Sequence, residues 1–336
     1  MSKEMDVIIA YSTRPQTPKN YEEYFDKNIK LIKVKNFTRN INPLKDIKAF
    51  FEVRKRIKNE KPEIVHMHSS KAGAIGRLAI SSKKIKLFYT PHGYSFCKKD
   101  DSTIKRNAYK MIEKILGRKR CITIACSKGE YDESLKVTKN SMYINNGIDI
   151  EDINKYIWDE PEKFINIEKL KICTVGRIGY QKNPKLFNEI AKAFPQIQFT
   201  WIGDGELREI LTEPNIEVLG WCDREKAIKS LYQNDIFILP SLWEGLPITL
   251  LEAMYLKKIC LVSNVMGNKD VIKNGIDGFI CEKLEDYCNI IQKIINGEID
   301  PIKIKNKARE KVITEHSLDK ISQEYLKIYC KGDGCY

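Results

Sequence analysis

The feature that constrains the fold most strongly is a repeated alternation of short apolar runs with helix-like stretches. This alternation occurs in the first half of the chain and again in the second half. In the N-terminal half, β-rich runs bounded by turn residues lie at 6–10, 31–34, 64–68, 87–90, 121–125 and 141–144. In the C-terminal half they lie at 170–175, 198–202, 216–219, 236–239, 259–262 and 278–281. Strands that alternate with helices form parallel sheets covered on both faces. The pattern therefore predicts two doubly wound α/β domains.

The gap between the two series of strands sets the expected domain boundaries. A chain of 336 residues exceeds the size at which one core keeps growing. Segment 151–169 carries Pro161 and many charges without a clear period, so it is predicted to link a domain at 1–150 to a domain at 170–316. Segment 317–336 begins with apolar residues at helical spacing, which predicts a helix. This helix could pack on either domain, and one option is that it crosses back to the N-terminal domain. We expect a ligand in the cleft between the domains.

The positive charge of the chain is concentrated in the first domain. Residues 1–150 contain 32 Lys and Arg against 16 Asp and Glu, a net charge of +16, whereas the remainder contains 26 against 29, a net charge of −3. An anionic partner is therefore expected there, and nucleic acid, lipid headgroups and phosphorylated acceptors all carry suitable charge. The basic half contains no zinc finger or RNP-like aromatic pattern, so nucleic acid is not expected.

One segment of the basic half suits a membrane surface. Between residues 102 and 118, an apolar helical stripe is flanked by basic side chains. This pattern predicts either an interfacial helix on an anionic membrane or a surface helix whose stripe packs on the core. The stripe consists of Ile104, Ala108, Met111, Ile112 and Ile115, and its flanks of Lys105, Arg106, Lys110, Lys114 and Arg118.

The beginning of the chain and its cysteines indicate the cytoplasm. The apolar stretch 7–10 is too short for a signal-peptide core or a spanning helix. The ten cysteines lack paired metal-ligand spacing, and several lie in or beside apolar runs, so reduced, buried thiols are expected. These are Cys126, Cys173, Cys260 and Cys281.

Two glutamates follow the apolar run 236–239. Glu244 lies in a turn, and Glu252 lies in a helix that Pro247 is suited to open. Free N–H groups at such a helix start bind anions or polar oxygens, and Gly245 lets a ligand approach the backbone closely. The pair resembles the Glu-x7-Glu signature of retaining GT-B glycosyltransferases, and the sequence here is similar to glycosyltransferase family 4.

A second motif follows the first strand of the second domain. Gly176-Arg177 is followed, after four intervening residues, by Lys182-Asn183, and this pattern is similar to the diphosphate site of that family. The departing nucleoside diphosphate gains negative charge as the glycosidic bond breaks, and fixed Arg and Lys donors stabilise it as a metal would. The resemblance assigns Arg177 and Lys182 to the diphosphate, Glu252 to the ribose hydroxyls, Glu244 with Gly245 and Leu246 to the donor sugar, and Asn268 to the same donor site.

Histidines end two strands of the first domain. His66 and His68 lie in the run 64–68, and His92 follows the run 87–90. By the same resemblance, His92 reaches the donor sugar, and His66 or His68 shapes the cleft floor. A His-x-His pair also suits zinc, but no further ligand lies nearby in sequence. Asp204 and Glu206 imitate an Asp-x-Asp metal site that family 4 does not use in this way, and no metal is expected.

One loop departs from the family pattern. Many relatives carry paired glycines in the loop after the first strand, where they face the acceptor and the diphosphate, and loop 10–15 has none. The resemblance therefore does not extend to the acceptor contacts at this loop. The same absence argues against an NAD-binding Rossmann site, which needs Gly-x-Gly-x-x-Gly.

The resemblance covers nearly the whole chain, least in residues 1–60, and implies a GT-B fold with two Rossmann-like domains facing across a cleft. It implies a retaining enzyme that moves a hexose-type sugar from a nucleotide sugar, with UDP expected, to a glycan or lipid-linked acceptor of surface polysaccharide such as capsule, without a cofactor. His92, Arg177, Lys182 and Glu244 carry the chemistry. No side chain is an evident nucleophile, which favours front-face substitution. A nucleotide-sugar 2-epimerase of the same fold and a non-catalytic partner subunit remain as alternatives.

Overall fold

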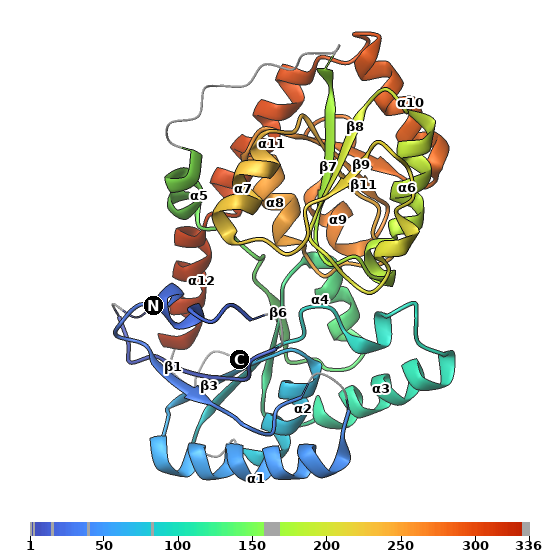
Figure 1. Cartoon of the computed structure of the whole chain (residues 1–336). Coiled ribbons are helices and arrows are strands. Elements are labelled where there is room, and N and C mark those ends of the chain that lie inside the picture. Colours follow the sequence, from blue (N-terminus) through green and yellow to red (C-terminus); the bar gives the residue numbers. More distant parts are fainter. Residues whose placement is uncertain are drawn as a thin grey trace.

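The computed structural model describes residue 2 and residues 4–14, 17–38, 41–81, 84–157 and 169–330. Figure 1 shows two α/β lobes, with the first half of the chain in the lower lobe and most of the second half in the upper lobe. Neighbouring strands pair in parallel in both lobes.

No helix in the described ranges is long and apolar enough to span a bilayer. The nine cysteines in these ranges form no disulfide, and Cys126, Cys173, Cys260 and Cys281 are buried as expected.

The N-terminal lobe holds a four-stranded sheet and a separate strand pair. The sheet has the order β3 (Ile64–His68), β4 (Lys86–Thr90), β5 (Ile122–Ala125), β6 (Ser141–Tyr143). The pair consists of β1 (Ile8–Tyr11) and β2 (Lys30–Lys33). The sequence predicts one continuous sheet, but exposed and half-buried residues alternate along β1. β1 therefore lacks the cover on both faces that buries β4.

Helices of the N-terminal lobe begin at polar caps that the sequence supplies. Asn42, Ser102 and Ser127 each accept a hydrogen bond from the N–H three residues later, which satisfies an otherwise free donor at the helix start. The elements are η1 (Tyr21–Tyr24), α1 (Pro43–Glu60), α2 (Ser70–Ala79), η2 (Ser95–Cys97), α3 (Thr103–Leu116) and α4 (Lys128–Leu135).

The C-terminal lobe is a doubly wound six-stranded sheet. Its order is β12 (Phe279–Cys281), β11 (Ile259–Ser263), β10 (Ile236–Leu239), β7 (Lys171–Val175), β8 (Gln198–Ile202), β9 (Ile216–Val218). The winding reverses between β10 and β7, and the loops that leave these strands diverge to open a crevice at their carboxyl ends. The motif that contains Arg177 and Lys182 follows β7, and the motif that contains Glu244 and Glu252 follows β10.

Helices cover both faces of this sheet and bury two apolar clusters, one against each face. Leu250, Leu251 and Met254 belong to one cluster, and Phe187, Phe199 and Trp201 to the other. The elements are η4 (Tyr180–Lys182), α6 (Pro184–Ala193), η5 (Arg208–Ile210), α7 (Arg224–Tyr232), α8 (Ile248–Tyr255), α9 (Met266–Val271), α10 (Leu284–Ile295) and α11 (Pro301–Glu315).

The first part of the predicted linker is a helix, α5 (Ile150–Ile157), and not an irregular segment. Ile153 is fully buried in the core of the C-terminal lobe, and Asp152 lies 3.2 Å from Arg224 of α7. Burial of one helical face therefore orders a stretch whose charges hide its period. Residues 158–168 of the predicted linker lie outside the described residues.

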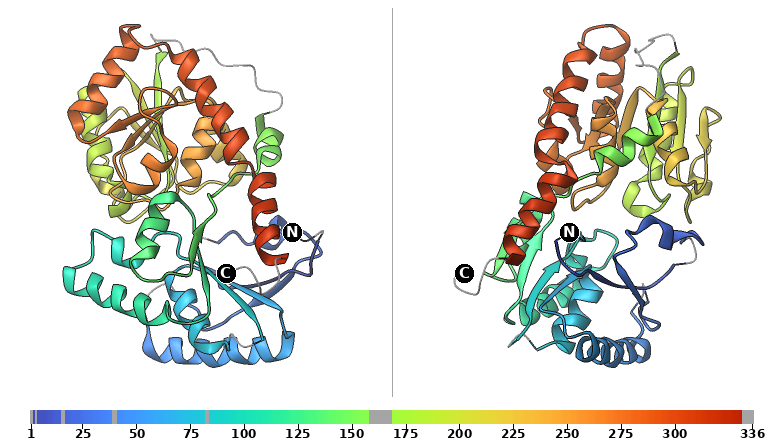
Figure 2. Two further views of the ribbon diagram at one scale, coloured as in Figure 1. Left: turned by 180° about the vertical axis from the view of Figure 1, so that it is seen from behind. Right: turned by 90° about the vertical axis from the view of Figure 1, so that its left-hand side faces the viewer.

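The last helix, α12 (Leu318–Cys330), leaves the C-terminal lobe and packs on the N-terminal one. Ile321, Ile328 and Tyr329 join Phe88 and Ile124 of the N-terminal sheet in one apolar cluster. Figure 2 shows this helix descending from the upper lobe along the side of the lower lobe. Residues 331–336 of the predicted segment lie outside the described residues.

Candidate active site

The two donor motifs of the sequence meet at the reversal point of the C-terminal sheet. Lys182, after β7, and Glu244, after β10, form an ion pair with Nζ and Oε1 2.7 Å apart. Gln181 supports the same loop, because its Nε2 donates to the carbonyl of Trp243 at 2.9 Å. Glu244 is 7% exposed, so its charge is held in a site with little water. The predicted residues Lys182 and Glu244 thus lie in one cluster. Gln181 also belongs to this cluster and was not predicted as a site residue.

Arg177 forms its ion pair with a residue outside this cluster. Its Nε donates to Glu206 at 2.8 Å, and the side chain is partly exposed. Asp204 pairs with Arg208 at 3.1 Å. Each acid of the Asp-x-Asp-like pair therefore has an arginine partner. Across the ranges that the structure describes, no group of three His, Cys, Asp or Glu side chains is placed to hold a metal.

Glu252 is buried on α8 and has a cationic partner that the sequence did not reveal. Arg224 of α7 binds it with Nη1 and Oε1 2.5 Å apart, and also binds Asp152 of α5. Burial raises the pKa of Glu252, and the adjacent Arg224 guanidinium opposes this rise. Arg224 thus ties the predicted ribose carboxylate to the helix that joins the lobes.

The start of α8 has free polar groups that suit an anion. Pro247 precedes the helix as its N-cap and supplies no side-chain hydrogen bond to the free N–H groups of the first turn. The Thr249 hydroxyl is buried and has no partner among the described residues. Gly245, Leu246 and Ile248 line a cavity of about 310 Å³ in front of this turn. Unpaired donors and the helix dipole together favour a bound phosphate here.

Asn268 lies behind this loop and lines neither of the two cavities described here. It is fully buried on α9, and its Nδ2 donates to the carbonyl and hydroxyl oxygens of Ser263 at 3.1 Å. The neighbouring Gly267 touches the loop, because a Cβ there would lie 2.2 Å from the carbonyl oxygen of Gly245. The observed contacts place Asn268 in support of the loop, and its predicted contact with the donor stays a prediction.

The histidines of the N-terminal lobe form a connected row. His92 Nε2 lies 2.9 Å from His68 Nδ1, and His66 contacts Thr90 at 2.8 Å and Tyr329 of α12 at 2.5 Å. Burial and the nearby His68 lower the pKa of His92 to about 4. Burial, together with His68 and His92, lowers the pKa of His66 to about 2. The row is therefore neutral at pH 7.

The His92 turn faces the donor loop directly. A Cβ at Gly245 would lie 3.2 Å from the backbone nitrogen of Gly93, so only glycine allows the lobes this approach without displacing atoms. Glu130 of α4 holds the turn from behind, because its carboxylate accepts the N–H of Gly93 at 2.5 Å and that of Cys126 at 2.7 Å. Glu130 was not predicted as a site residue.

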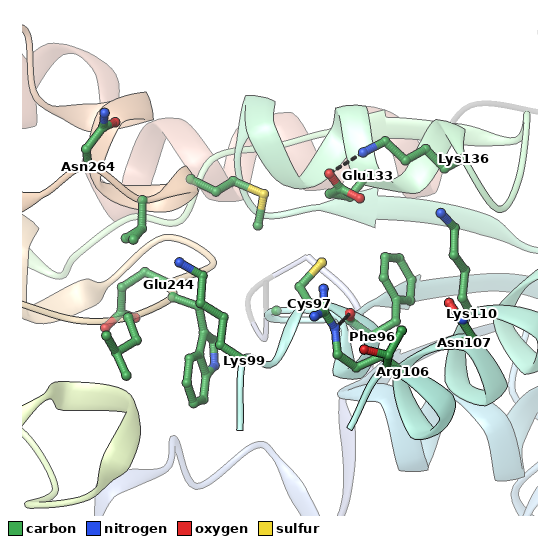
Figure 3. A pocket seen from close by; sticks show the side chains of 16 residues that line it. Phe96, Cys97, Lys99, Arg106, Asn107, Lys110, Glu133, Lys136, Glu244 and Asn264 are labelled. Carbon is green, nitrogen blue, oxygen red and sulfur yellow. Dashed lines mark hydrogen bonds and ion pairs between the residues drawn. The ribbon is translucent and has the colours of Figure 1, made fainter. Parts of the chain in front are cut away.

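A second, larger cavity of about 520 Å³ adjoins the first, and Gly93, Trp243 and Glu244 line both. Figure 3 shows Glu244 and Asn264 on one side of it, and Arg106, Lys110 and Lys136 on the other. The two cavities meet where the His92 turn faces Glu244. This junction can bring two bound molecules together.

Known proteins are similar to this chain along most of its length. A family profile named Glycosyltransferase Family 4 matches residues 2–152, and one named Glycosyl transferases group 1 matches residues 158–311. A UDP-Gal:α-D-GlcNAc-diphosphoundecaprenol α-1,3-galactosyltransferase of Escherichia coli is 33% identical over an alignment of 344 positions, gaps included, which spans 90% of this chain and 85% of that protein. The chain belongs to glycosyltransferase family 4. It is therefore an enzyme that transfers a sugar.

A further relative is similar to this chain in sequence, and solved structures are similar to it in fold. An N,N'-diacetylbacillosaminyl-diphospho-undecaprenol α-1,3-N-acetylgalactosaminyltransferase of Campylobacter jejuni is 26% identical over an alignment of 336 positions, gaps included, which spans 90% of this chain and 86% of that protein. Sucrose-phosphate synthase of Thermosynechococcus elongatus superposes with a TM-score of 0.78 at 16% identity, covering 98% of this chain and 89% of that one. Anabaena HepE in complex with UDP-glucose superposes with a TM-score of 0.74 at 15% identity, covering 96% of this chain and 91% of that one. The GT-B fold predicted from the sequence is confirmed.

Proposed function

We propose that this family 4 glycosyltransferase moves a hexose from a UDP-sugar, with retention of anomeric configuration and without a bound metal, to a lipid-linked acceptor of bacterial surface polysaccharide. The observation that carries the proposal is the Lys182–Glu244 pair beside the open start of α8. The names of the Escherichia coli and Campylobacter jejuni relatives state diphosphoundecaprenol acceptors, and that of the former also states a UDP-sugar donor. HepE binds UDP and UDP-glucose.

The donor fits the C-terminal side of the junction. Its diphosphate would accept hydrogen bonds from the first turn of α8 and from Arg177 and Lys182, whose present partners are the carboxylates Glu206 and Glu244. Glu252 would accept the ribose hydroxyls. Glu244, released from full pairing with Lys182, would accept a hydroxyl of the sugar. Two fixed cations then supply the charge that a metal ion supplies in other phosphate sites.

The reaction follows from this placement. The bond between C1 of the sugar and the diphosphate oxygen breaks, and a bond between C1 and the acceptor oxygen forms on the same face. The acceptor proton passes to the leaving diphosphate, which gives UDP and the extended acceptor. His92, from the facing turn, hydrogen-bonds the sugar as a neutral imidazole. It is uncharged at pH 7 because its pKa is near 4.

The N-terminal lobe supplies the contact with the membrane. The apolar stripe of α3 faces solvent and not the core, since Ile104, Met111, Ile112 and Ile115 are 84%, 58%, 47% and 55% exposed. On α1, Leu44, Ile47 and Phe51 are exposed as well. Apolar side chains on a lobe of net charge +16 complement an anionic lipid surface. A peripheral contact would bring the enzyme to a lipid-linked acceptor.

The stereochemistry and the need for metal are tested with a panel of UDP- and GDP-sugars in the presence of EDTA. We expect an α-linked product from an α-linked UDP-sugar, seen by NMR, at the same rate with and without EDTA. Inversion of the anomeric centre, or loss of activity restored by a divalent cation, would contradict the proposal. Epimerised nucleotide sugar without any acceptor would indicate the epimerase instead.

A further inference from the structure

Helix α3 presents three different faces along its length. Glu113 and Leu116 are buried on the first. The second is the apolar stripe that faces solvent. The third lines the cavity of about 520 Å³ with Thr103, Arg106, Asn107 and Lys110, which follow one another at helical spacing. The cationic face therefore lies between the core face and the apolar stripe.

Cations exceed available carboxylates in this cavity. Lys99, Arg106, Lys110 and Lys136 line it, and the acids are Glu133 and Glu244. Glu133 is paired with Lys136, and Glu244 with Lys182. Within the described part of the chain, Lys99, Arg106 and Lys110 have no carboxylate within 4.0 Å, the limit for an ion pair.

Arg106 and Lys110 are held in place without being neutralised. Arg106 Nε donates to the carbonyl of Phe96 at 3.0 Å, which leaves its two terminal nitrogens for another acceptor. The Lys110 ammonium lies 5.9 Å from the centre of the Phe96 ring. Figure 3 shows both side chains on the α3 side of the cavity, across from Glu244. A fixed guanidinium and a nearby ammonium suit the several oxygens of a diphosphate.

We propose that Arg106 and Lys110 bind the diphosphate of the lipid-linked acceptor. This assignment rests on the proposed function. The acceptor sugar then lies between this diphosphate and the junction at Gly93 and Glu244, since one cavity contains both ends. The lipid chain leaves along the adjacent apolar stripe of α3. A single helix thus positions the charged and the apolar part of one acceptor.

Phosphate groups could reach these cations from the acceptor or from membrane headgroups. The cavity favours the acceptor, because its far wall is formed by Trp243, Glu244 and Asn264 of the C-terminal lobe. A bilayer that lies against the outer stripe of α3 does not enter a space between two lobes. The experiment is therefore done in neutral detergent micelles, without anionic lipid, and repeated with anionic vesicles.

The test compares Arg106→Gln and Lys110→Gln with Lys105→Gln, a matched control whose ammonium pairs with Asp101 and does not line the cavity. The acceptors are N-acetylglucosamine linked to farnesyl diphosphate and an octyl glycoside of the same sugar without phosphate. In micelles, we expect KM for the diphosphate acceptor to rise about tenfold or more in each cavity variant. KM for the octyl glycoside, the affinity for UDP and the behaviour of the control should stay at wild-type values.

Three outcomes would overturn the proposal. One is an unchanged KM for the diphosphate acceptor, and another is an equal rise for both acceptors. The third is an effect seen only with anionic vesicles, which would assign the cations to headgroups. Wild-type enzyme that binds UDP but extends neither acceptor would instead remove the proposed function itself. If loss of the Phe96 contact unfolds Arg106→Gln, Lys110→Gln alone decides, since Lys110 makes no hydrogen bond among the described residues.

Discussion

The ammonium of Lys182 lies 2.7 Å from a carboxylate oxygen of Glu244, where β7 and β10 end and the winding of the C-terminal sheet reverses. Sixty-two residues of sequence separate the pair. Under the proposed function, the contact places the cation for a leaving diphosphate beside the acid for the sugar. Charge that develops during transfer is therefore met by a donor already in position.

Replacing Lys182 by alanine should remove this donor and leave Glu244 buried without its partner. We expect kcat/KM for transfer to fall about a hundredfold, because a fixed donor to a developing anion contributes on that scale. Lys185→Ala is the matched control, since that side chain is 78% exposed on the same loop-to-helix segment. Steady-state kinetics with one UDP-sugar measure both. Equal rates for Lys182→Ala and wild type would exclude Lys182 from the reaction.

Glu130→Gln tests the support of the His92 turn. Glutamine keeps one acceptor oxygen for the two N–H groups of Gly93 and Cys126, so the turn should shift and kcat should fall about tenfold. The affinity for UDP, measured by calorimetry, should stay unchanged because the proposed UDP site lies on the other lobe. Asp132→Asn on the same helix is the control, with its side chain 59% exposed. A weaker UDP affinity at unchanged kcat would contradict a positioning role for Glu130.

The histidine row should make folding sensitive to acid. His92 has a pKa of about 4 when folded and an ordinary value of 6.5 when unfolded. Below pH 6.5 the unfolded chain therefore binds a proton that the folded chain does not, and stability falls as the pH drops toward 4. Each such histidine contributes a slope of up to about 1.4 kcal/mol per pH unit.

Urea unfolding of wild type and His92→Asn at pH 7.5 and pH 5 measures this contribution. The loss of unfolding free energy between the two pH values should be smaller in the variant, because one buried histidine has been removed. A variant that loses as much stability as wild type would show that His92 does not titrate in this range.

The exposed stripe of α3 should bind membranes. Ile104→Ser combined with Met111→Ser should reduce co-sedimentation with phosphatidylglycerol vesicles about tenfold or more, since each side chain loses apolar area that the bilayer would bury. Thermal stability should not change, because both side chains are exposed. Ile302→Ser, at an exposed position of the C-terminal lobe, is the control. Vesicle binding equal to that of the control would leave α3 without a membrane role.

Local patterns predicted much of this structure. Each of the twelve β-rich runs overlaps an observed strand, because apolar runs between turn residues are fixed by short-range sequence. The Arg177–Lys182 and Glu244–Glu252 motifs were recognised by their resemblance to glycosyltransferase family 4. Arg224 and Glu130 were missed, because Glu252 and Gly93, which they contact at the site, lie on other elements of the chain.

The remaining differences also have non-local causes. α5 forms because Ile153 enters the core of the C-terminal lobe, a contact that a charged and aperiodic stretch does not reveal. The exposure of the α3 stripe depended on which face of that helix the lobe covers, and composition left both options open.

The central claim is tested most directly by mass spectrometry of N-acetylglucosamine linked to farnesyl diphosphate after incubation with the wild-type enzyme, EDTA and each UDP-hexose in turn. The account predicts that one UDP-hexose adds a single hexose to this acceptor, with release of UDP. An acceptor that stays unmodified with every nucleotide sugar offered, although the enzyme binds UDP, would contradict it.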